Sequence, residues 1–264
     1  MTPGTTLGPI RIAKAAFFST CHDSARDVLD GRERAFAAPA YGLLVGRARR
    51  FTSLVTQMHV EVCGALQPEA QGAPAVFATC HGEIQTCERL ITDFRDTAMV
   101  SSARFALSVH NTASGMYSVA TGSTAPTTTI TGTNAIAAGW LEASLLALDA
   151  DRPVLLSIAD EPVPAVFCTP IEPVGFAAAF LVGAGGAGTG TVRNADGCAA
   201  ELVVTACPGD PVPVIDPLKA LARAADGCAP YGAGTAPVTV ALGPIQPGAI
   251  LELRIWPSPA EARA

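Results

Sequence analysis

Charged side chains are scarce in this 264-residue chain. Lys, Arg, Asp and Glu make up 15 % of the residues and apolar types 49 %, whereas charged residues are about 25 % of a typical soluble domain. Two explanations stay open. The abundant alanine, glycine and proline can lower the charge fraction. Alternatively, a large obligate interface covers part of the surface, because such interfaces resemble a domain core cut in half.

An excess of positive charge and long apolar runs are also missing. The chain has 17 basic and 23 acidic residues, and its one basic cluster is "RARR", with Arg47, Arg49 and Arg50. Nucleic acid is therefore not an expected partner. No run of 18 apolar residues exists, and the longest uncharged span, 105–141, is rich in Thr, Ser and Gly, so no membrane span is expected. Arg11 and Lys14 interrupt the apolar start, which excludes a signal peptide and predicts a cytoplasmic protein.

Metal-ligand and disulfide patterns are absent as well. The eight cysteines include no C-x-x-C pair, and the four histidines have no zinc-ligand spacing. Cys63, Cys168 and Cys207 lie in apolar segments, where a free thiol behaves as a small hydrophobic group. We expect reduced cysteines, no metal and no cofactor.

Hydrophobic periodicity predicts alternating strands and helices. We expect strands at 8–19, 73–80, 126–132, 152–160, 175–182, 201–207, 236–243 and 248–256. We expect helices at 47–66, 83–96, from 112 onward, 134–149 and 216–227. Up to residue 182 the order is β-α-β-α-α-β-α-β-β, which favours a layered α/β domain. No linker composition divides the chain, so 1–264 is predicted to be a single domain.

Two short motifs are candidates for chemistry. Ser114 follows His110 by four residues, but Thr112 and Met116 occupy the glycine positions of a G-x-S-x-G nucleophile turn. "CHGE" places Cys80, a histidine and Glu83 at a strand end. Side chains of neighbouring residues diverge, and Glu83 fits the first turn of the next helix, where the helix dipole favours a carboxylate.

Three longer stretches resemble the N-terminal half of a β-ketoacyl synthase, in the thiolase superfamily. They are "RARRFTSLVTQMHVEV", "AVFATCHGE" and "FALSVHNTASGMYSVATGSTAPTTTITGTNAIAAGWLEA". The likeness covers residues 8–183 and is closest to short chain-length-factor-like proteins of aryl-polyene synthases. It implies a thiolase-like half, a mixed β-sheet with helices on both faces. Residues 8–183 would form its core, and 184–264 would be a strand-rich extension packed on it.

The resemblance also locates the position of the family's nucleophilic cysteine. In the family, a Val-x-Asn segment, two glycines and a proline precede the cysteine at a fixed spacing. The matching residues here are Val109, Asn111, Gly115, Gly122 and Pro126. Counted from that proline, the cysteine position falls on Asn134, or on Thr133 after a slip of one residue. A carboxamide is not a useful nucleophile, and a lone threonine needs an activating base. Chain length factors typically carry glutamine there, another amide. The two histidines of the ketosynthase C-terminal half have no counterpart after residue 110.

These features imply a non-catalytic, chain-length-factor-like subunit of polyene or fatty-acid-like biosynthesis. It would form a heterodimer with a catalytic β-ketoacyl synthase and meet acyl carrier protein indirectly. In this superfamily the strand at this position, Thr127, Thr128, Thr129, Ile130 and Thr131, pairs across the dimer interface. The expected tunnel-wall residues are Met116, Tyr117 and Trp140. The helix at 134–149 would need covering by residues after 184.

Two alternatives stay open. One is an acyltransferase or hydrolase that uses Thr133, Ser114 or Cys80. The other is a structural homodimer.

Overall fold

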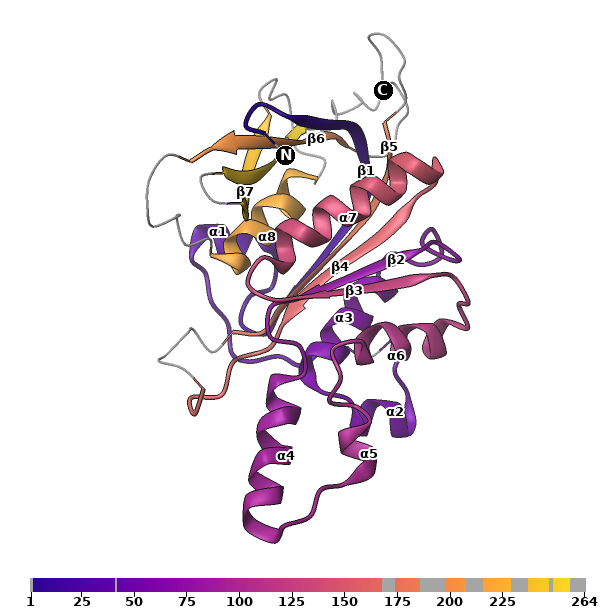
Figure 1. Ribbon diagram of the computed structural model, residues 1–264, viewed down its shortest axis with the longest axis vertical. Coiled ribbons are helices and arrows are strands. Elements are labelled where there is room, and N and C mark those ends of the chain that lie inside the picture. The colour runs from indigo at the N-terminus through magenta and orange to yellow at the C-terminus, as the bar shows by residue number, and fades with distance from the viewer. Residues whose placement is uncertain are drawn as a thin grey trace.

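The computed structural model describes residues 2–40, 42–167, 174–185, 198–207, 216–228, 237–246 and 249–256. Within them, eight strands form one sheet in the order β3-β2-β4-β5-β1-β6-β8-β7 (Figure 1). The pairs β3–β2 and β2–β4 are parallel, and the remaining pairs are antiparallel. The strands are β1 (Thr6–Ser19), β2 (Ala75–Thr79), β3 (Thr127–Thr131), β4 (Val154–Asp160), β5 (Phe176–Ala184), β6 (Cys198–Ala206), β7 (Val238–Gln246) and β8 (Ala249–Trp256).

Helices cover both faces of this sheet, which confirms the predicted mixed α/β fold class. They are α1 (Ala25–Asp30), α2 (Gly46–Phe51), α3 (Leu54–Gly64), α4 (Ile84–Thr97), α5 (Ser102–Phe105), α6 (Thr112–Thr121), α7 (Ala135–Ala150) and α8 (Pro217–Gly227). Side chains of a strand alternate between faces. Val76 and Ala78 therefore join the core under α7 and α8, and Phe77 joins the core under α3 and α6.

Helix α7 lies very close to the sheet at Gly139. A Cβ atom there would meet Ala78 Cβ at 2.8 Å and Leu156 Cδ1 at 3.3 Å. On another side, β7 approaches so closely that a Cβ at Gly243 would lie 3.7 Å from Ala137 Cβ. The described part of the chain after residue 184 therefore packs against α7, whose sequence is apolar nearly all round.

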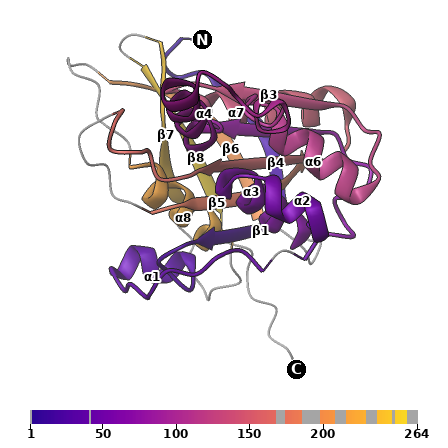
Figure 2. The same ribbon diagram turned by 90° about the horizontal axis from the view of Figure 1, so that it is seen from below.

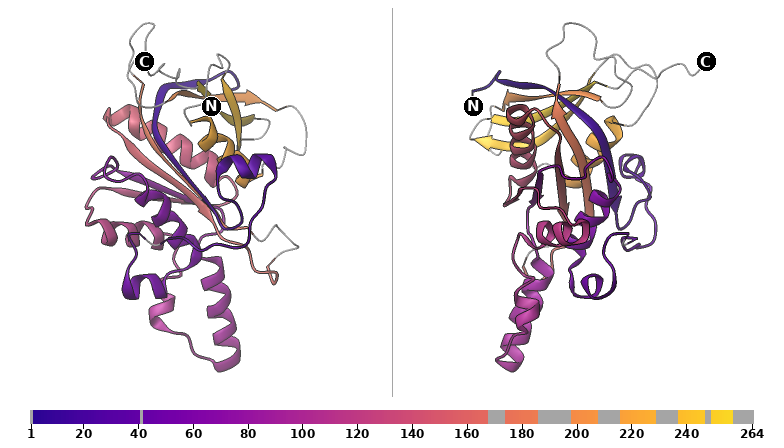
Figure 3. Two further views of the ribbon diagram at one scale, coloured as in Figure 1. Left: turned by 180° about the vertical axis from the view of Figure 1, so that it is seen from behind. Right: turned by 90° about the vertical axis from the view of Figure 1, so that its right-hand side faces the viewer.

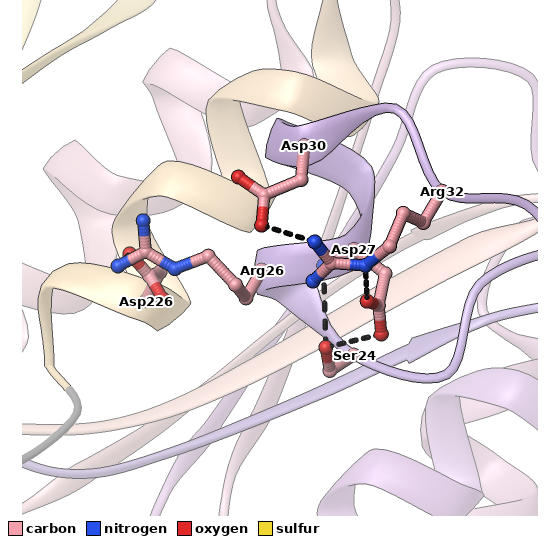
Figure 4. Close-up of polar contacts among 6 residues, drawn as sticks. All are labelled: Ser24, Arg26, Asp27, Asp30, Arg32 and Asp226. Carbon is pink, nitrogen blue, oxygen red and sulfur yellow. Dashed lines mark hydrogen bonds and ion pairs between the residues drawn. The ribbon is translucent and has the colours of Figure 1, made fainter.

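The described residues after 184 also contact the N-terminal region, because α8 lies side by side with α1 (Figures 3 and 4). Arg26 Nη2 lies 2.8 Å from Asp226 Oδ2. Ser24 caps α1 by accepting a hydrogen bond from Asp27 N, and Arg32 Nε donates to Asp27 Oδ1 at 2.6 Å. Exposed ion pairs of this kind contribute little stability, so packing between the helices holds the contact.

Some elements differ from the sequence prediction. The expected helix at 47–66 is broken into α2 and α3, because Thr52 Oγ1 donates to Ala48 O at 2.9 Å and Ser53 Oγ accepts from Thr56 N at 3.2 Å. Ser53 thereby caps a new helix. The short helices α1 and α5 have no counterpart in the prediction.

Helices α4 and α5 form an arm, residues 84–109, that projects from the body near the β3 edge of the sheet (Figures 1 and 2). In α4 only Leu90 is buried, although one side of this helix is apolar as predicted. Phe94 is 61 % exposed and Met99 is 70 % exposed. The other exposed apolar residues of the arm are Ile91, Val100, Phe105 and Val109.

Among the described residues, no helix combines the length and apolar character needed to cross a membrane.

Candidate functional site

Asn134, the residue predicted from the sequence to match the family's nucleophile position, lies just after the carboxyl end of β3, where the chain turns into α7. Gly132 makes this turn with φ +116°, a conformation that favours glycine. Asn134 is the N-cap of α7, and its carbonyl accepts a hydrogen bond from Ala138 N at 2.9 Å. The side chains of Thr133 and Asn134 are both exposed. The fold thus places residue 134 at a helix N-terminus beside solvent.

This location suits an anionic nucleophile, but the residue there does not. The positive end of a helix lowers the pKa of a thiol placed on it. The carboxamide of Asn134 has no ionisable proton to lose at neutral pH. Thr133 has no hydrogen bond to a His, Asp or Glu side chain among the described residues, so no base activates its hydroxyl.

Ser114 is held by structural hydrogen bonds. Its hydroxyl donates to Asn111 O at 2.9 Å and accepts from Thr129 Oγ1 at 3.4 Å. His110 is exposed at the base of the arm. In the described part of the chain no hydrogen bond joins His110 to Ser114, so the two do not form a base and nucleophile pair.

Cys80 is unreactive for an electrostatic reason. Its backbone N–H and that of His81 both donate to the carboxylate of Asp160 at 3.0 Å. Burial, and then the charge of Asp160, raise the pKa of the Cys80 thiol to about 12. A protonated thiol is a weak nucleophile. The "CHGE" residues do not converge, since His81 is exposed and Glu83 turns toward α3.

Two buried carboxyl groups, Glu83 and Glu161, hold the base of the arm. Glu161 accepts hydrogen bonds from Val55 N at 3.2 Å and Gln85 N at 2.9 Å, in the first turns of α3 and α4. Glu83 accepts from Thr56 Oγ1 at 2.5 Å. Burial raises the pKa of both groups, that of Glu161 to about 7, and the charge of Glu83 adds to the effect on Glu161.

Reasoning from the sequence assigned no role to Glu161. The sequence does contain a signal for this residue. Asp160 and Glu161 follow an otherwise apolar strand, and an acidic residue that is buried there needs a partner. Within the described residues, no group of three or more His, Cys, Asp or Glu side chains is arranged to hold a metal ion.

The three tunnel candidates have different surroundings. Trp140 is fully buried and packs on Phe180 with ring centroids 4.7 Å apart. Met116 is half-buried against the core under α3 and α6. Tyr117 accepts a hydrogen bond from Gln67 Nε2 at 2.9 Å and lines a cleft of about 320 Å³ beside the α6–β3 loop. Most of the residues that line the cleft are polar. The full set is Gln67, Gln71, Gly72, Tyr117, Thr121, Gly122, Ser123, Thr124, Ala125, Pro126 and Arg152.

Strand β3 has one free edge. Among the described strands it pairs only with β2, starting where Ala75 N donates to Pro126 O at 3.0 Å. Main-chain groups of a strand point alternately to its two sides. The even-numbered residues of β3 therefore bond β2, and the odd-numbered ones turn their N–H and C=O groups to the free edge. These are Thr127, Thr129 and Thr131.

Comparisons with known proteins agree with this geometry. The family model for the β-ketoacyl synthase N-terminal domain matches residues 33–206. No curated protein sequence matches the chain. A solved structure described as the ketosynthase ApeO in complex with its chain length factor ApeC, from Xenorhabdus doucetiae, is similar at a TM-score of 0.60 and 18 % identity. The match covers 78 % of this chain and 79 % of that chain.

A β-ketoacyl synthase from Burkholderia phymatum is similar at a TM-score of 0.50 and 14 % identity, covering 83 % of this chain and 69 % of that one. Sequence identities of 18 % and 14 % show that this chain shares the fold of these two proteins, and nothing beyond the fold. The family match spans more than half of the sequence and includes β2, the arm, β3 and α7. This chain is therefore a member of the β-ketoacyl synthase N-terminal domain family.

Proposed function

We propose that this chain is a non-catalytic, chain-length-factor-like subunit. It forms a heterodimer with a catalytic β-ketoacyl synthase in the cytoplasm and takes part in polyene or fatty-acid-like biosynthesis. The observation that carries the proposal is Asn134, a carboxamide at the helix N-terminus where this family places its nucleophile. Acyl carrier protein would meet the complex mainly through the catalytic subunit.

The lack of a reactive group supports a non-catalytic role. Thr133 has no base, Ser114 bonds a backbone carbonyl, and the thiol of Cys80 stays protonated at neutral pH. The described residues also hold two serine–histidine hydrogen bonds, Ser19–His22 at 2.9 Å and Ser157–His59 at 2.8 Å, but both pairs are buried and neither lines the cleft beside the α6–β3 loop. The acyltransferase or hydrolase alternative therefore has no geometric support at Thr133, Ser114 or Cys80, the residues that it would use.

Two surfaces support a partner. The free edge of β3 offers unpaired main-chain groups and carries no charged side chain, and exposed strand edges of this kind are templates for pairing with another chain. The neighbouring arm exposes a group of large apolar residues, including Phe94, Met99 and Phe105. Such a patch is typical of an interaction site.

The similar complex supports the same partner class. That structure contains a ketosynthase together with its chain length factor, and its matched chain has nearly the same covered share as this one. In the proposed heterodimer, β3 would extend the partner's sheet. Met116 and Tyr117, on the helix α6 that packs beside β3, would lie near the joint and set the length of the acyl tunnel. Trp140 would act only from within the core, by supporting α7.

The test is co-purification. The tagged chain is co-expressed with the ketosynthase encoded nearest to its gene, and a stable 1:1 complex is expected. The isolated chain is then incubated with an acyl thioester and its intact mass is measured, with no acyl adduct expected. A stable, monodisperse chain that ignores the ketosynthase would contradict the partnership, and a covalent acyl adduct would contradict the non-catalytic role. Self-association without the ketosynthase would favour the structural homodimer.

A further inference from the structure

Three arginines from three different elements meet at the base of the arm. Arg50 of α2, Arg89 of α4 and Arg104 of α5 line one cleft of about 200 Å³ between the arm and the start of α3. Arg50 belongs to the one basic cluster of the sequence. The remaining lining residues are Phe51, Thr52, Ser53, Thr86, Ser101 and Ala103.

The cleft carries excess positive charge. Arg104 Nη1 pairs with Asp93 Oδ2 at 2.5 Å. In the described part of the chain, no carboxylate lies within ion-pair distance of Arg50 or Arg89. Three guanidinium groups therefore face one carboxylate. The buried acids Glu83 and Glu161 do not line the cleft but lie close behind it, because the cleft residue Thr86 donates to Glu83 Oε2 at 3.3 Å and the charge of Arg89 acts to lower the pKa of Glu161.

Two of the four hydroxyl groups of the cleft already donate, Thr52 Oγ1 to Ala48 O and Thr86 Oγ1 to Glu83 Oε2. Ser53 Oγ and Ser101 Oγ accept from Thr56 N and Arg104 N, and each keeps an O–H proton. The guanidinium N–H groups of Arg50 and Arg89 are the charged donors that remain. A ligand of this cleft must accept hydrogen bonds and carry negative charge.

We propose that this cleft binds the phosphate group of an organic phosphate monoester. A carboxylate has two oxygens in one plane and is satisfied by the fork of a single arginine, whereas a phosphate offers three oxygens in three directions. A phosphate monoester carries a charge of about −1.5 to −2 at neutral pH, which balances three arginines and one aspartate. The exposed ring of Phe51 lies on the cleft wall and would contact the carbon part of the ligand.

This inference does not depend on the proposed partnership, and either can fail alone. The test is a calorimetric titration of the full chain in phosphate-free buffer with phenyl phosphate, inorganic phosphate and benzoate. Phenyl phosphate is expected to bind with saturation. Inorganic phosphate is expected to bind more weakly because it lacks the ring, and benzoate more weakly because it lacks the third oxygen.

Variants locate the site. Arg50→Ala and Arg89→Ala are each expected to raise the Kd for phenyl phosphate about tenfold or more, because each removes a charge-assisted hydrogen bond. The Kd of Arg50→Lys for phenyl phosphate is expected to lie between that of Arg50→Ala and that of the natural chain. Arg95→Ala, on the same arm but outside the cleft, is the matched control and should bind normally. All three positions, 50, 89 and 95, are exposed, and circular dichroism checks that each variant is folded.

Three outcomes would overturn the proposal. The first is no saturable binding of phenyl phosphate. The second is equal weakening in Arg95→Ala and Arg89→Ala, which would mean diffuse attraction to surface charge. The third is benzoate binding as tightly as phenyl phosphate, which would mean a general anion site without selection for phosphate.

Discussion

At the scale of single residues, Glu161 predicts a measurable pH dependence. Its pKa is raised from 4.5 to about 7, so the folded state binds this proton more tightly than the unfolded state does. The stability that the neutral form contributes is complete below pH 4.5 and is lost as pH rises through 7. The difference between the two pKa values corresponds to about 3 kcal/mol.

The variant Glu161→Gln cannot titrate. It also loses one acceptor for the amides of Val55 and Gln85, which lowers its stability by a constant amount of about 1–3 kcal/mol. We therefore expect the natural chain to lose up to about 3 kcal/mol relative to the variant between pH 4.5 and pH 8. Urea unfolding at several pH values measures this difference. A difference that stays flat across the range would show that Glu161 is ionised throughout.

Residue 134 allows a direct test of the site geometry. In Asn134→Cys, the introduced thiol stands at the N-terminus of α7 in solvent, where the helix dipole lowers its pKa by roughly one unit. We expect alkylation by iodoacetamide at pH 7 to be faster than in Val119→Cys, an exposed position in the last turn of α6, away from a helix N-terminus. The native Cys80 should react slowest. Equal rates at the two introduced thiols would mean that α7 exerts no such effect.

At the scale of elements, the close packing of α7 depends on Gly139. An added methyl group would overlap Ala78, and overpacking of this kind costs about 1–3 kcal/mol. That loss exceeds the gain in helix propensity of about 1 kcal/mol. We expect Gly139→Ala to destabilise the fold in thermal or urea unfolding, and Ala78→Gly in the same chain to restore part of the loss.

Gly115 in α6 is the matched control. Nothing lies within 4 Å of the position that its Cβ would occupy. Gly115→Ala should therefore raise the free energy of unfolding by up to about 1 kcal/mol, from helix propensity alone. If both substitutions were neutral or stabilising, the tight contact between α7 and β2 would not be present in solution.

The elements also show what a sequence can and cannot predict. The strand at 73–80 is predicted by a short apolar run between turn residues, the strand at 126–132 by β-branched residues, and the helix at 134–149 by a long apolar segment, and the structure confirms all three. The break at Thr52 was missed because the local hydrogen bonds of Thr52 and Ser53 override a continuous apolar pattern. The acid pair Glu83 and Glu161 comes together only through the pairing of β2 with β4, which no local pattern contains.

The arm shows a different limit. Its apolar periodicity predicts an amphipathic helix, which α4 is, but periodicity does not say what covers the apolar side. In the structure, Leu90 is the one residue of α4 that is buried against the rest of this chain. Helix α7 begins where the sequence pattern predicts it, with Asn134 as its N-cap. The match of residue 134 to the family's nucleophile position depends on the family's spacing and stays a prediction.

At the scale of the whole molecule, the free edge of β3 and the exposed apolar residues of the arm are the surfaces where the proposed partner would bind. Thr129 is the most informative position on that edge. Its N–H points away from β2, so Thr129→Pro removes a group that only a partner would use, and proline is tolerated on a strand edge of this kind. Thr129→Val keeps the N–H and the side-chain shape and serves as the matched control.

The central claim is that this chain completes a heterodimer with a ketosynthase through β3. Native mass spectrometry of the co-expressed pair tests it most directly. We predict a 1:1 heterodimer for the natural chain and for Thr129→Val, and separate, folded subunits for Thr129→Pro. A heterodimer that persists in Thr129→Pro would contradict pairing through β3, and a monomer or homodimer of the natural chain beside an unbound ketosynthase would contradict the whole account.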